Sequence, residues 1–277
     1  MTDVPPFAAV VRAALAEDLA EGGDVTTLAT IDEHATGSAR FVARQAGVVA
    51  GLPVAAGVYE AVSGGRVRFT PLVEDGARIK PGDVLATVEG PLRDLLTGER
   101  TALNLLGQLS GVASLTRRWV DAVEGTGARI RDTRKTIPGL RALQKYAVRC
   151  GGGVNHRMSL SDAALVKDNH VAAAGGVVEA FRLVRSKYPD LPLEVEADTL
   201  EQARAVIDAG ADLVLLDNMS LDDLRAAVAY ADGRAELEAS GGLRLEDARP
   251  VAATGVHYLS IGALTHSAPV LDIGLDL

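Results

Sequence analysis

From Ala128 onward the chain repeats one unit, a short apolar strand followed by a turn and a helix, and this repetition constrains the fold more than any other feature. Six segments carry the strand pattern: ARIRD, AALVKD, LPLEVEA, DLVLLDN, AELEASGG and HYLSIGA. Helical segments such as TLEQARAVIDAG and LDDLRAAVAYA lie between them. Strands that alternate with helices favour a parallel sheet, because each helix returns the chain to start the next strand in the same direction.

The residues that end successive strands are regularly spaced. Lys167, Glu196, Asp217, Ser240 and Gly262 are separated by 29, 21, 23 and 22 positions, which is one strand–helix unit each time. We therefore predict an α/β barrel. A doubly wound open sheet is the alternative, because strand order cannot be read from one sequence.

The first hundred residues follow another pattern. A helix predicted over residues 6–19 leads into short alternating segments separated by Gly-rich turns, which predict a small antiparallel sheet with flanking helices. A long helix is predicted over residues 92–123, where Gly107 and Gly111 indicate breaks or close packing. We place an N-terminal α+β domain at 1–110 and the barrel domain at 111–266, and we expect the tail at 267–277 to pack back on the first domain.

Composition excludes several classes of protein. The net charge of −9 disfavours a general nucleic-acid binder, and no apolar run approaches the roughly 20 residues of a membrane span. The N-terminus lacks the basic start of a signal peptide. Cys150 is the one cysteine of the chain, so no intrachain disulfide can form and a reducing, cytoplasmic location fits.

The charge is unevenly distributed. Residues 129–157 hold eight Lys or Arg and one acid, a sum of +7 that leaves −16 for the rest of the chain. Such a basic segment predicts a local anion site. Its helix face at Arg141, Lys145 and Arg149, spaced four apart, is assigned mainly to solvent. An RNA-binding role is disfavoured by the acidic total and the missing aromatic stacking positions.

Polar residues follow the predicted strands at their C-terminal ends. They are Arg134 and Lys135, Lys167 and Asp168, Glu196, Asp217 and Asn218, and Ser240. Parallel barrels build active sites at this mouth, because rigid strand ends point at one volume. Polar ends on consecutive strands therefore predict an active site there.

Several motifs together resemble the quinolinate phosphoribosyltransferase family over essentially the whole chain. They are ERTALNLLGQLSGVA, RDTRKTIPGLRALQKYAVRCGGGVNHR, VKDNH, EVEADT, LLDN, EASGG and IGALTHSAPVLDIGL. The resemblance implies a sandwich-like N-terminal domain, an incomplete α/β barrel, and a homodimer or larger assembly in which one subunit's N-terminal domain covers the other's barrel mouth. It implies phosphoribosyl transfer from phosphoribosyl pyrophosphate to quinolinate with decarboxylation, giving nicotinate mononucleotide for NAD synthesis.

The resemblance also implies the residues that bind quinolinate, a flat ring with two adjacent carboxylates. Guanidinium groups bind carboxylates in a bidentate manner, and the expected cationic cradle comprises Thr133, Arg134, Lys135, His156 and Arg157. Arg100 resembles the family residue donated by the neighbouring subunit. Its alternative is an ordinary surface arginine beside Glu99.

The second substrate requires Mg²⁺ at its pyrophosphate, and Glu196 and Asp217 are the expected carboxylates, direct or through water, with Glu194 a lesser candidate. Lys135, Glu196 and Asp217 form the expected catalytic set. Lys167 resembles the family lysine near the pyrophosphate, with a Schiff-base lysine as its alternative. The 5′-phosphate is expected at two small-residue loops: Ser240, Gly241 and Gly242, and Ile261, Gly262 and Ala263.

Three other interpretations remain at this stage. Cys150 lies six residues before His156, which suggests a catalytic thiol, although a lone cysteine usually packs. Residues 72–90, with Lys80, resemble half of a biotinyl or lipoyl carrier domain. A phosphoribosyltransferase for another anionic aromatic ring is the third, and the paired Arg134 and Lys135 favour a dicarboxylate over it.

Overall fold

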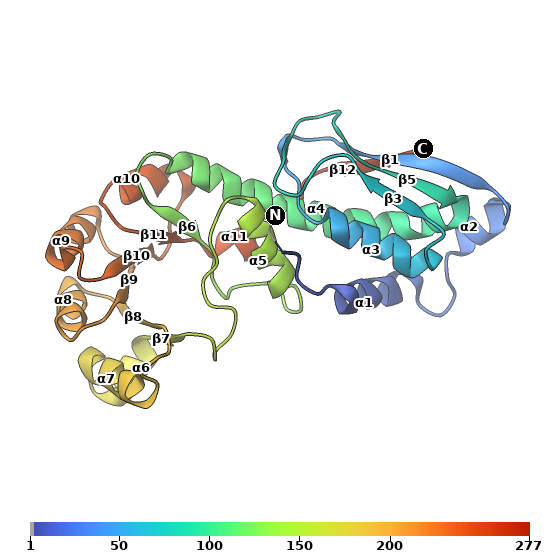
Figure 1. Ribbon diagram of the computed structural model, residues 1–277. Coiled ribbons are helices and arrows are strands. Elements are labelled where there is room, and N and C mark those ends of the chain that lie inside the picture. The colour runs from blue at the N-terminus through green and yellow to red at the C-terminus, as the bar shows by residue number, and fades with distance from the viewer. Residues whose placement is uncertain (1–2) are drawn as a thin grey trace. The chain divides into compact units, whose positions relative to one another are not determined.

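The computed structural model describes residues 3–277; residues 1–2 of the predicted N-terminal domain lie outside this range. The chain divides into two compact units (Figure 1). One contains the stretch up to Arg117 with Thr136–Gly152 and Leu264–Leu277, and the other contains Arg118–Lys135 and Gly153–Ala263. The chain therefore passes between the units more than once.

The first unit contains a four-stranded antiparallel sheet in the order β12-β1-β5-β3. The strands are β1 (Thr36–Ala43), β3 (Arg68–Pro71), β5 (Val84–Pro91) and β12 (Ile273–Asp276), with β2 (Gly47–Val48) and β4 (Arg78–Ile79) in a separate pair. Phe41 of β1 is fully buried and its ring packs edge-on against Tyr59 at 6.1 Å between centroids. The last strand of the chain lies beside the first (Figure 1).

Helices complete this unit, and the predicted long helix is present without a break. They are α1 (Ala8–Leu19), α2 (Val25–Thr30), α3 (Leu52–Ser63), α4 (Leu92–Ala122) and α5 (Arg141–Cys150), with α11 (Ala263–His266) at the change of unit. The glycines of α4 mark close packing. A Cβ on Gly111 would lie 2.1 Å from the Pro269 carbonyl oxygen, and one on Gly107 would lie 3.0 Å from that of Leu271.

The expected solvated face of α5 is wrong at its centre, because Lys145 is fully buried. The helix is enclosed on more than one side. The Tyr146 hydroxyl donates to Asp75 at 2.6 Å, and the Gln144 amide donates to the Thr265 carbonyl at 2.6 Å. Spacing by four identifies one face of a helix, but it does not tell whether solvent or protein covers that face.

The second unit contains the predicted parallel sheet of six strands, in the order β6-β11-β10-β9-β8-β7. They are β6 (Arg129–Arg131), β7 (Ala164–Val166), β8 (Leu193–Ala197), β9 (Leu213–Asp217), β10 (Glu236–Ser240) and β11 (Tyr258–Ser260). The first strand pairs with the last, while β7 forms the opposite edge. No ladder joins β6 to β7 within residues 3–277, so the incomplete α/β architecture is confirmed.

Helices follow the strands and pack along the sheet (Figure 1). They are α6 (Asp168–Ala174), α7 (Val177–Lys187), α8 (Leu200–Asp208), α9 (Leu221–Ala231), the 3-10 turn η1 (Leu245–Asp247) and α10 (Ala248–Ala252). Side chains of Thr199 and Ser220 cap α8 and α9 by accepting from backbone N–H groups. Within the described range, every helix is too short or too polar to cross a bilayer.

Alternation along the strands separates two environments. Val195, Val214 and Leu237 point to the face that the helices cover, and all three are fully buried. The neighbouring positions place Glu194, Glu196 and Glu238 on the opposite face. This opposite face is the concave interior of the incomplete barrel, and it is unusually polar for a barrel core.

Candidate active site

A pocket of about 390 Å³ lies at the carboxyl ends of the parallel strands. Its lining is Thr133, Arg134, Lys135, His156, Arg157, Leu165, Lys167, Glu196, Leu215, Asp217, Glu238, Ser240 and Ser260. Nine of these residues are candidates from the sequence, and the structure brings them together. A second groove, of about 740 Å³, is lined mainly by apolar side chains such as Leu160 and Leu183, which does not suit anionic substrates.

The remaining sequence candidates do not line this pocket. Arg100 is exposed on α4 in the first unit, without an ion partner among the described residues. The Ile261 N–H donates to the Arg131 carbonyl at 2.9 Å, so that amide is already used inside the sheet. Gly262 lies between β11 and α11, and Ala263 is the first residue of α11.

Gly241 and Gly242 form a tight loop after β10, and both have positive φ, at +93° and +58°. A Cβ on Gly241 would lie 2.2 Å from the Asn218 side-chain oxygen, so this position has room only for glycine. Asn218 itself has a left-handed backbone, with φ of 53°, and its N–H donates to the Ser240 carbonyl at 2.9 Å. The ends of β9 and β10 are thereby held together.

Two arginines provide the cationic side of the pocket. Burial, and then the positive charge of Arg134, lowers the pKa of Arg157. The Arg134 Nε is buried and has no hydrogen-bond acceptor among residues 3–277. Two guanidinium groups close enough for their charges to interact, one with an unused buried donor, form a site that an anion would stabilise.

The loop that carries His156 and Arg157 is fixed by Asp132, a residue that sequence reasoning noted only as the one acid of the basic segment. Asp132 is fully buried and accepts from the His156 N–H at 2.8 Å and from the Asn155 side chain. Val154 bridges to Arg131 in a parallel register. The sequence signal for this role was a single acid within a basic segment. A carboxylate buried there needs hydrogen-bond donors around it, so it is expected to hold the surrounding loop.

The acidic side of the pocket comes from β8 and β9. Glu196 forms an ion pair with the Lys167 ammonium through one carboxylate oxygen. Asp217 accepts from the Asn218 side chain at 2.6 Å, also through one oxygen. Each carboxylate thus keeps a second hard oxygen of the kind that Mg²⁺ prefers. The pairing of Lys167 as an ammonium also argues against a Schiff base, which requires the neutral amine.

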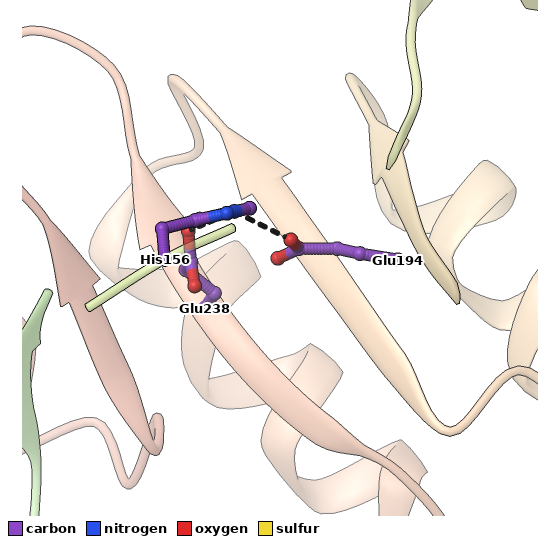
Figure 2. Close-up of side chains that lie close together, drawn as sticks. All are labelled: His156, Glu194 and Glu238. Atoms are coloured by element: carbon purple, nitrogen blue, oxygen red, sulfur yellow. Dashed lines mark ion pairs between the residues drawn. The ribbon is translucent and has the colours of Figure 1, made fainter. Parts of the chain in front are cut away.

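Beneath these groups lies a buried cluster of His156, Glu194 and Glu238 (Figure 2). The His156 Nε2 lies 2.7 Å from Glu194 Oε2 and 3.8 Å from Glu238 Oε1. Burial raises the pKa of each glutamate to about 7; the charge of Glu194 also raises that of Glu238, while Arg131 lowers both. Sequence reasoning missed Glu238 and ranked Glu194 low, although the strand alternation of ELEAS places Glu238 on the face of Ser240.

The cluster has the donor types of a metal site, but a protein cation already serves Glu238. The Arg131 Nη1 lies 2.6 Å from Glu238 Oε2, and the Ser260 hydroxyl donates to Glu238 Oε1. Both Glu238 oxygens therefore have donors. We treat the cluster as an ion-pair network beneath the pocket.

Cys150 does not have the environment of a catalytic thiol. It is buried at the end of α5, and burial raises the pKa of its thiol to about 11. A reactive cysteine needs a lowered pKa and access to substrate. The packing interpretation therefore holds.

Comparison with known proteins gives one consistent family. Residues 24–110 match the family model described as quinolinate phosphoribosyl transferase, N-terminal domain, and residues 112–276 match its C-terminal domain. The chain is 55% identical over 273 residues to a nicotinate-nucleotide pyrophosphorylase [carboxylating] of Mycobacterium leprae, covering 96% of this chain and 95% of that protein.

Two further relatives extend the comparison. A Nicotiana tabacum protein named quinolinate phosphoribosyltransferase [decarboxylating] 2b is 38% identical, covering 97% of this chain and 81% of the relative. The crystal structure of NadC from Streptococcus pyogenes superposes with a TM-score of 0.95 at 40% identity, covering 100% of this chain and 98% of that chain.

Replacing Glu238 by Gln should flatten the pH dependence of stability between about pH 5 and 8. Because the folded-state pKa of Glu238 is raised from 4.5 to about 7, its contribution is complete below 4.5 and is lost as pH rises through about 7. Each pKa unit corresponds to about 1.4 kcal/mol. Urea unfolding across this range should show a steeper loss in wild type than in Glu238→Gln. Glu236→Gln, on the same strand, should keep the wild-type slope, and equal slopes for all three proteins would contradict the assignment.

Proposed function

This chain belongs to the quinolinate phosphoribosyltransferase family, and we propose that the pocket at the carboxyl ends of β6–β11 is where it binds both substrates. The enzyme transfers the phosphoribosyl group of phosphoribosyl pyrophosphate to quinolinate with decarboxylation. The products are nicotinate mononucleotide, pyrophosphate and CO₂, in the de novo synthesis of NAD. The observation that supports the site is one pocket with Arg134 and Arg157 on one side and Glu196 and Asp217 on another.

The substrate itself supplies the means of decarboxylation. Attack of the ring nitrogen on the ribose carbon breaks the bond to pyrophosphate and makes the ring a pyridinium cation. Loss of the adjacent carboxylate as CO₂ leaves an electron pair on a carbon beside that positive charge, and a proton then adds to this carbon. The protein therefore has to hold two anions in reacting geometry. Holding two reactants in this way raises the reaction rate strongly by itself.

Quinolinate binds, in this proposal, at the cationic side. Arg134 offers the buried Nε that has no acceptor in the described chain, and Arg157 lies close enough for the two positive charges to interact. Lys135 and Thr133 follow β6 at the same edge, and the Lys135 N–H is held by the Thr133 hydroxyl at 3.0 Å. His156 lies at the floor of this side. A dicarboxylate would satisfy both guanidinium groups at once.

Phosphoribosyl pyrophosphate binds, in the same proposal, along β8, β9 and β10. Glu196 and Asp217 would hold Mg²⁺, directly or through water, and carboxylates at this place also stabilise a ribose carbon that gains positive charge. The metal would neutralise the pyrophosphate leaving group. Lys167 lies beside Glu196, where it would contact the pyrophosphate. Lys135, Glu196 and Asp217 are the residues we assign to catalysis.

The 5′-phosphate would lie at the loops after β10 and β11. The Ser240–Gly241–Gly242 loop brings backbone close to the pocket, because glycines with positive φ leave no side chain in the way. At the second loop, Ile261 is the weaker candidate, because its N–H donates to the Arg131 carbonyl. We place the enzyme in the cytoplasm, which suits its single buried free cysteine.

We further propose a homodimer or larger assembly whose sites are shared between subunits. Arg100 supports this, because it is an exposed cation on α4 and has no ion partner in the described chain. In a partner subunit's pocket, a carboxylate of bound quinolinate would form the ion pair that Arg100 lacks within its own unit.

Purified protein supplied with quinolinate, phosphoribosyl pyrophosphate and Mg²⁺ should release CO₂ and pyrophosphate in equal amounts. Nicotinate should be a poor substrate, because part of the cationic side would stay unpaired. Trapped ¹⁴CO₂ and a coupled pyrophosphate assay measure the two products. Efficient use of nicotinate, with no CO₂ from quinolinate, would instead indicate a phosphoribosyltransferase for another aromatic acid.

Changes on the two sides of the pocket should separate the two substrates. Arg134→Ala should weaken quinolinate binding by about 2–5 kcal/mol and leave phosphoribosyl pyrophosphate binding nearly unchanged, because a buried charge pair is lost. Glu196→Gln and Asp217→Asn should lower turnover and raise the Mg²⁺ requirement with quinolinate affinity retained. Isothermal titration with each ligand and Mg²⁺-dependent rates measure this. Equal losses for both ligands in every variant would contradict the division.

Mixing two inactive variants should restore activity if Arg100 acts in a neighbouring subunit. In a dimer of Arg100→Ala with Lys135→Ala, one site carries both changes and the other carries none. Recovery should grow as subunits exchange, and it should approach the wild-type rate for each unaltered site. Differently tagged subunits prove that the mixed dimer forms. No recovery in a proven mixed dimer would place Arg100 outside the shared site.

A further inference from the structure

The imidazole of His156 has a protein group close to each ring nitrogen. Its Nδ1 accepts from the Arg157 N–H at 2.7 Å, and its Nε2 lies 2.7 Å from Glu194 Oε2 (Figure 2). A nitrogen that accepts a hydrogen bond carries no proton, so the proton of a neutral ring is on Nε2, facing Glu194. His156 is only 8% exposed, and so little of its polar surface is open to the pocket.

Glu194 is placed to serve this ring. It extends from β8, two positions before Glu196, and is 3% exposed. Neither of its carboxylate oxygens has a hydrogen-bond partner of good geometry among residues 3–277, and the approach of Oε2 to His156 Nε2 is an ion-pair contact. Burying a carboxylate without full hydrogen bonding costs free energy of folding. We therefore expect this position of Glu194 to serve a function.

Arg157 links this buried contact to the pocket. The Arg157 backbone N–H is fixed by the imidazole, and its guanidinium Nη1 donates to the Ala163 carbonyl at 3.0 Å. The two contacts anchor both ends of the side chain. A rotated imidazole would release the Arg157 backbone N–H, and one of the contacts that orient the guanidinium would then be lost.

We propose that Glu194 is a positioning residue: it fixes the His156 ring and, through that ring, aims the Arg157 guanidinium at the substrate carboxylates. The proposal rests on the proposed function of the pocket. It gives His156 a supporting role toward Arg157 in addition to its place in the pocket lining. Glu238 has a different task, because Arg131 and Ser260 already donate to its oxygens.

Two substitutions separate the reach of the Glu194 side chain from its charge. Glu194→Gln removes the charge but keeps an oxygen at the same distance from His156 Nε2. Glu194→Asp keeps the charge but withdraws the oxygens by about one C–C bond, roughly 1.5 Å. Positioning by contact requires reach, so Gln should stay within about threefold of wild-type quinolinate affinity, whereas Asp should lose roughly 10- to 100-fold. Affinity for phosphoribosyl pyrophosphate should change by less than about twofold in both, because Glu194 contacts His156 whereas Glu196, on the same strand, is paired with Lys167.

The measurements are isothermal titration of each ligand, thermal unfolding, and ¹⁵N spectra of histidine-labelled protein. His156 should show the Nε2–H tautomer in wild type and Gln, and a mixture of tautomers in Asp. Glu236→Gln is the control. Glu236 extends from β10 on the same face as Glu238 and accepts from the Tyr258 hydroxyl. This variant should equal wild type in ligand affinity, melting temperature and histidine tautomer.

Several results would overturn the proposal. If Asp binds quinolinate like wild type while Gln does not, Glu194 acts by charge. Equal losses for both ligands with a lower melting temperature would show a structural role only. An Nδ1–H tautomer in wild type would refute it even if the Asp variant failed to fold. Wild-type protein that shows the Nε2–H tautomer yet binds no quinolinate would instead refute the proposed function, so the two failures are distinguishable.

Discussion

The buried ion pair between Arg131 and Glu238 is the interaction on which the interior of the second unit depends. It joins β6 to β10 across β11, whose Ser260 also donates to Glu238. Glu238 is fully buried, and an unpaired carboxylate there would cost several kcal/mol. The pair therefore ties the two sides of β11 together and determines that the barrel interior is ionic. The pair thereby connects strands whose carboxyl ends carry pocket residues.

The ionic layer supports a pocket whose own charges are less well balanced. Arg134 and Arg157 repel each other on one side, and Glu196 and Asp217 carry negative charge on another. A protein that held such charges without ligands would lose stability, whereas an anion and a metal would each find preorganised partners. Glu194 belongs to both levels, because it lies at the floor, contacts His156, and favours the charged forms of Arg131 and Arg157. Binding chemistry and fold thus use the same buried carboxylates.

Sequence reasoning was most accurate where the regular spacing of apolar residues indicated directly which positions are buried. The six parallel strands and the helices between them follow from apolar runs at regular spacing, and β8 and β9 fall inside the predicted segments LPLEVEA and DLVLLDN. It was wrong for Lys145, because the four-residue spacing does not tell what covers a helix face. It overlooked α6, a seven-residue helix with no buried residue and therefore no apolar stripe to read. Gly111 gave a signal of close packing, and only the fold identified Pro269 as the neighbour.

The sequence by itself determined the parallel architecture, the edge of the sheet that carries the polar residues, and the family. These depend on alternation within each strand and on motifs contiguous in the chain, so they are local properties. Tertiary structure decided which of those residues share a pocket, and it placed Glu238 and Glu194 under His156, from strands more than 40 positions apart along the chain. It also decided the partners of His156, which fix its tautomer. Such contacts depend on the order of the strands in the sheet and on the loop held by Asp132. Neither can be read from the order of residues along the chain.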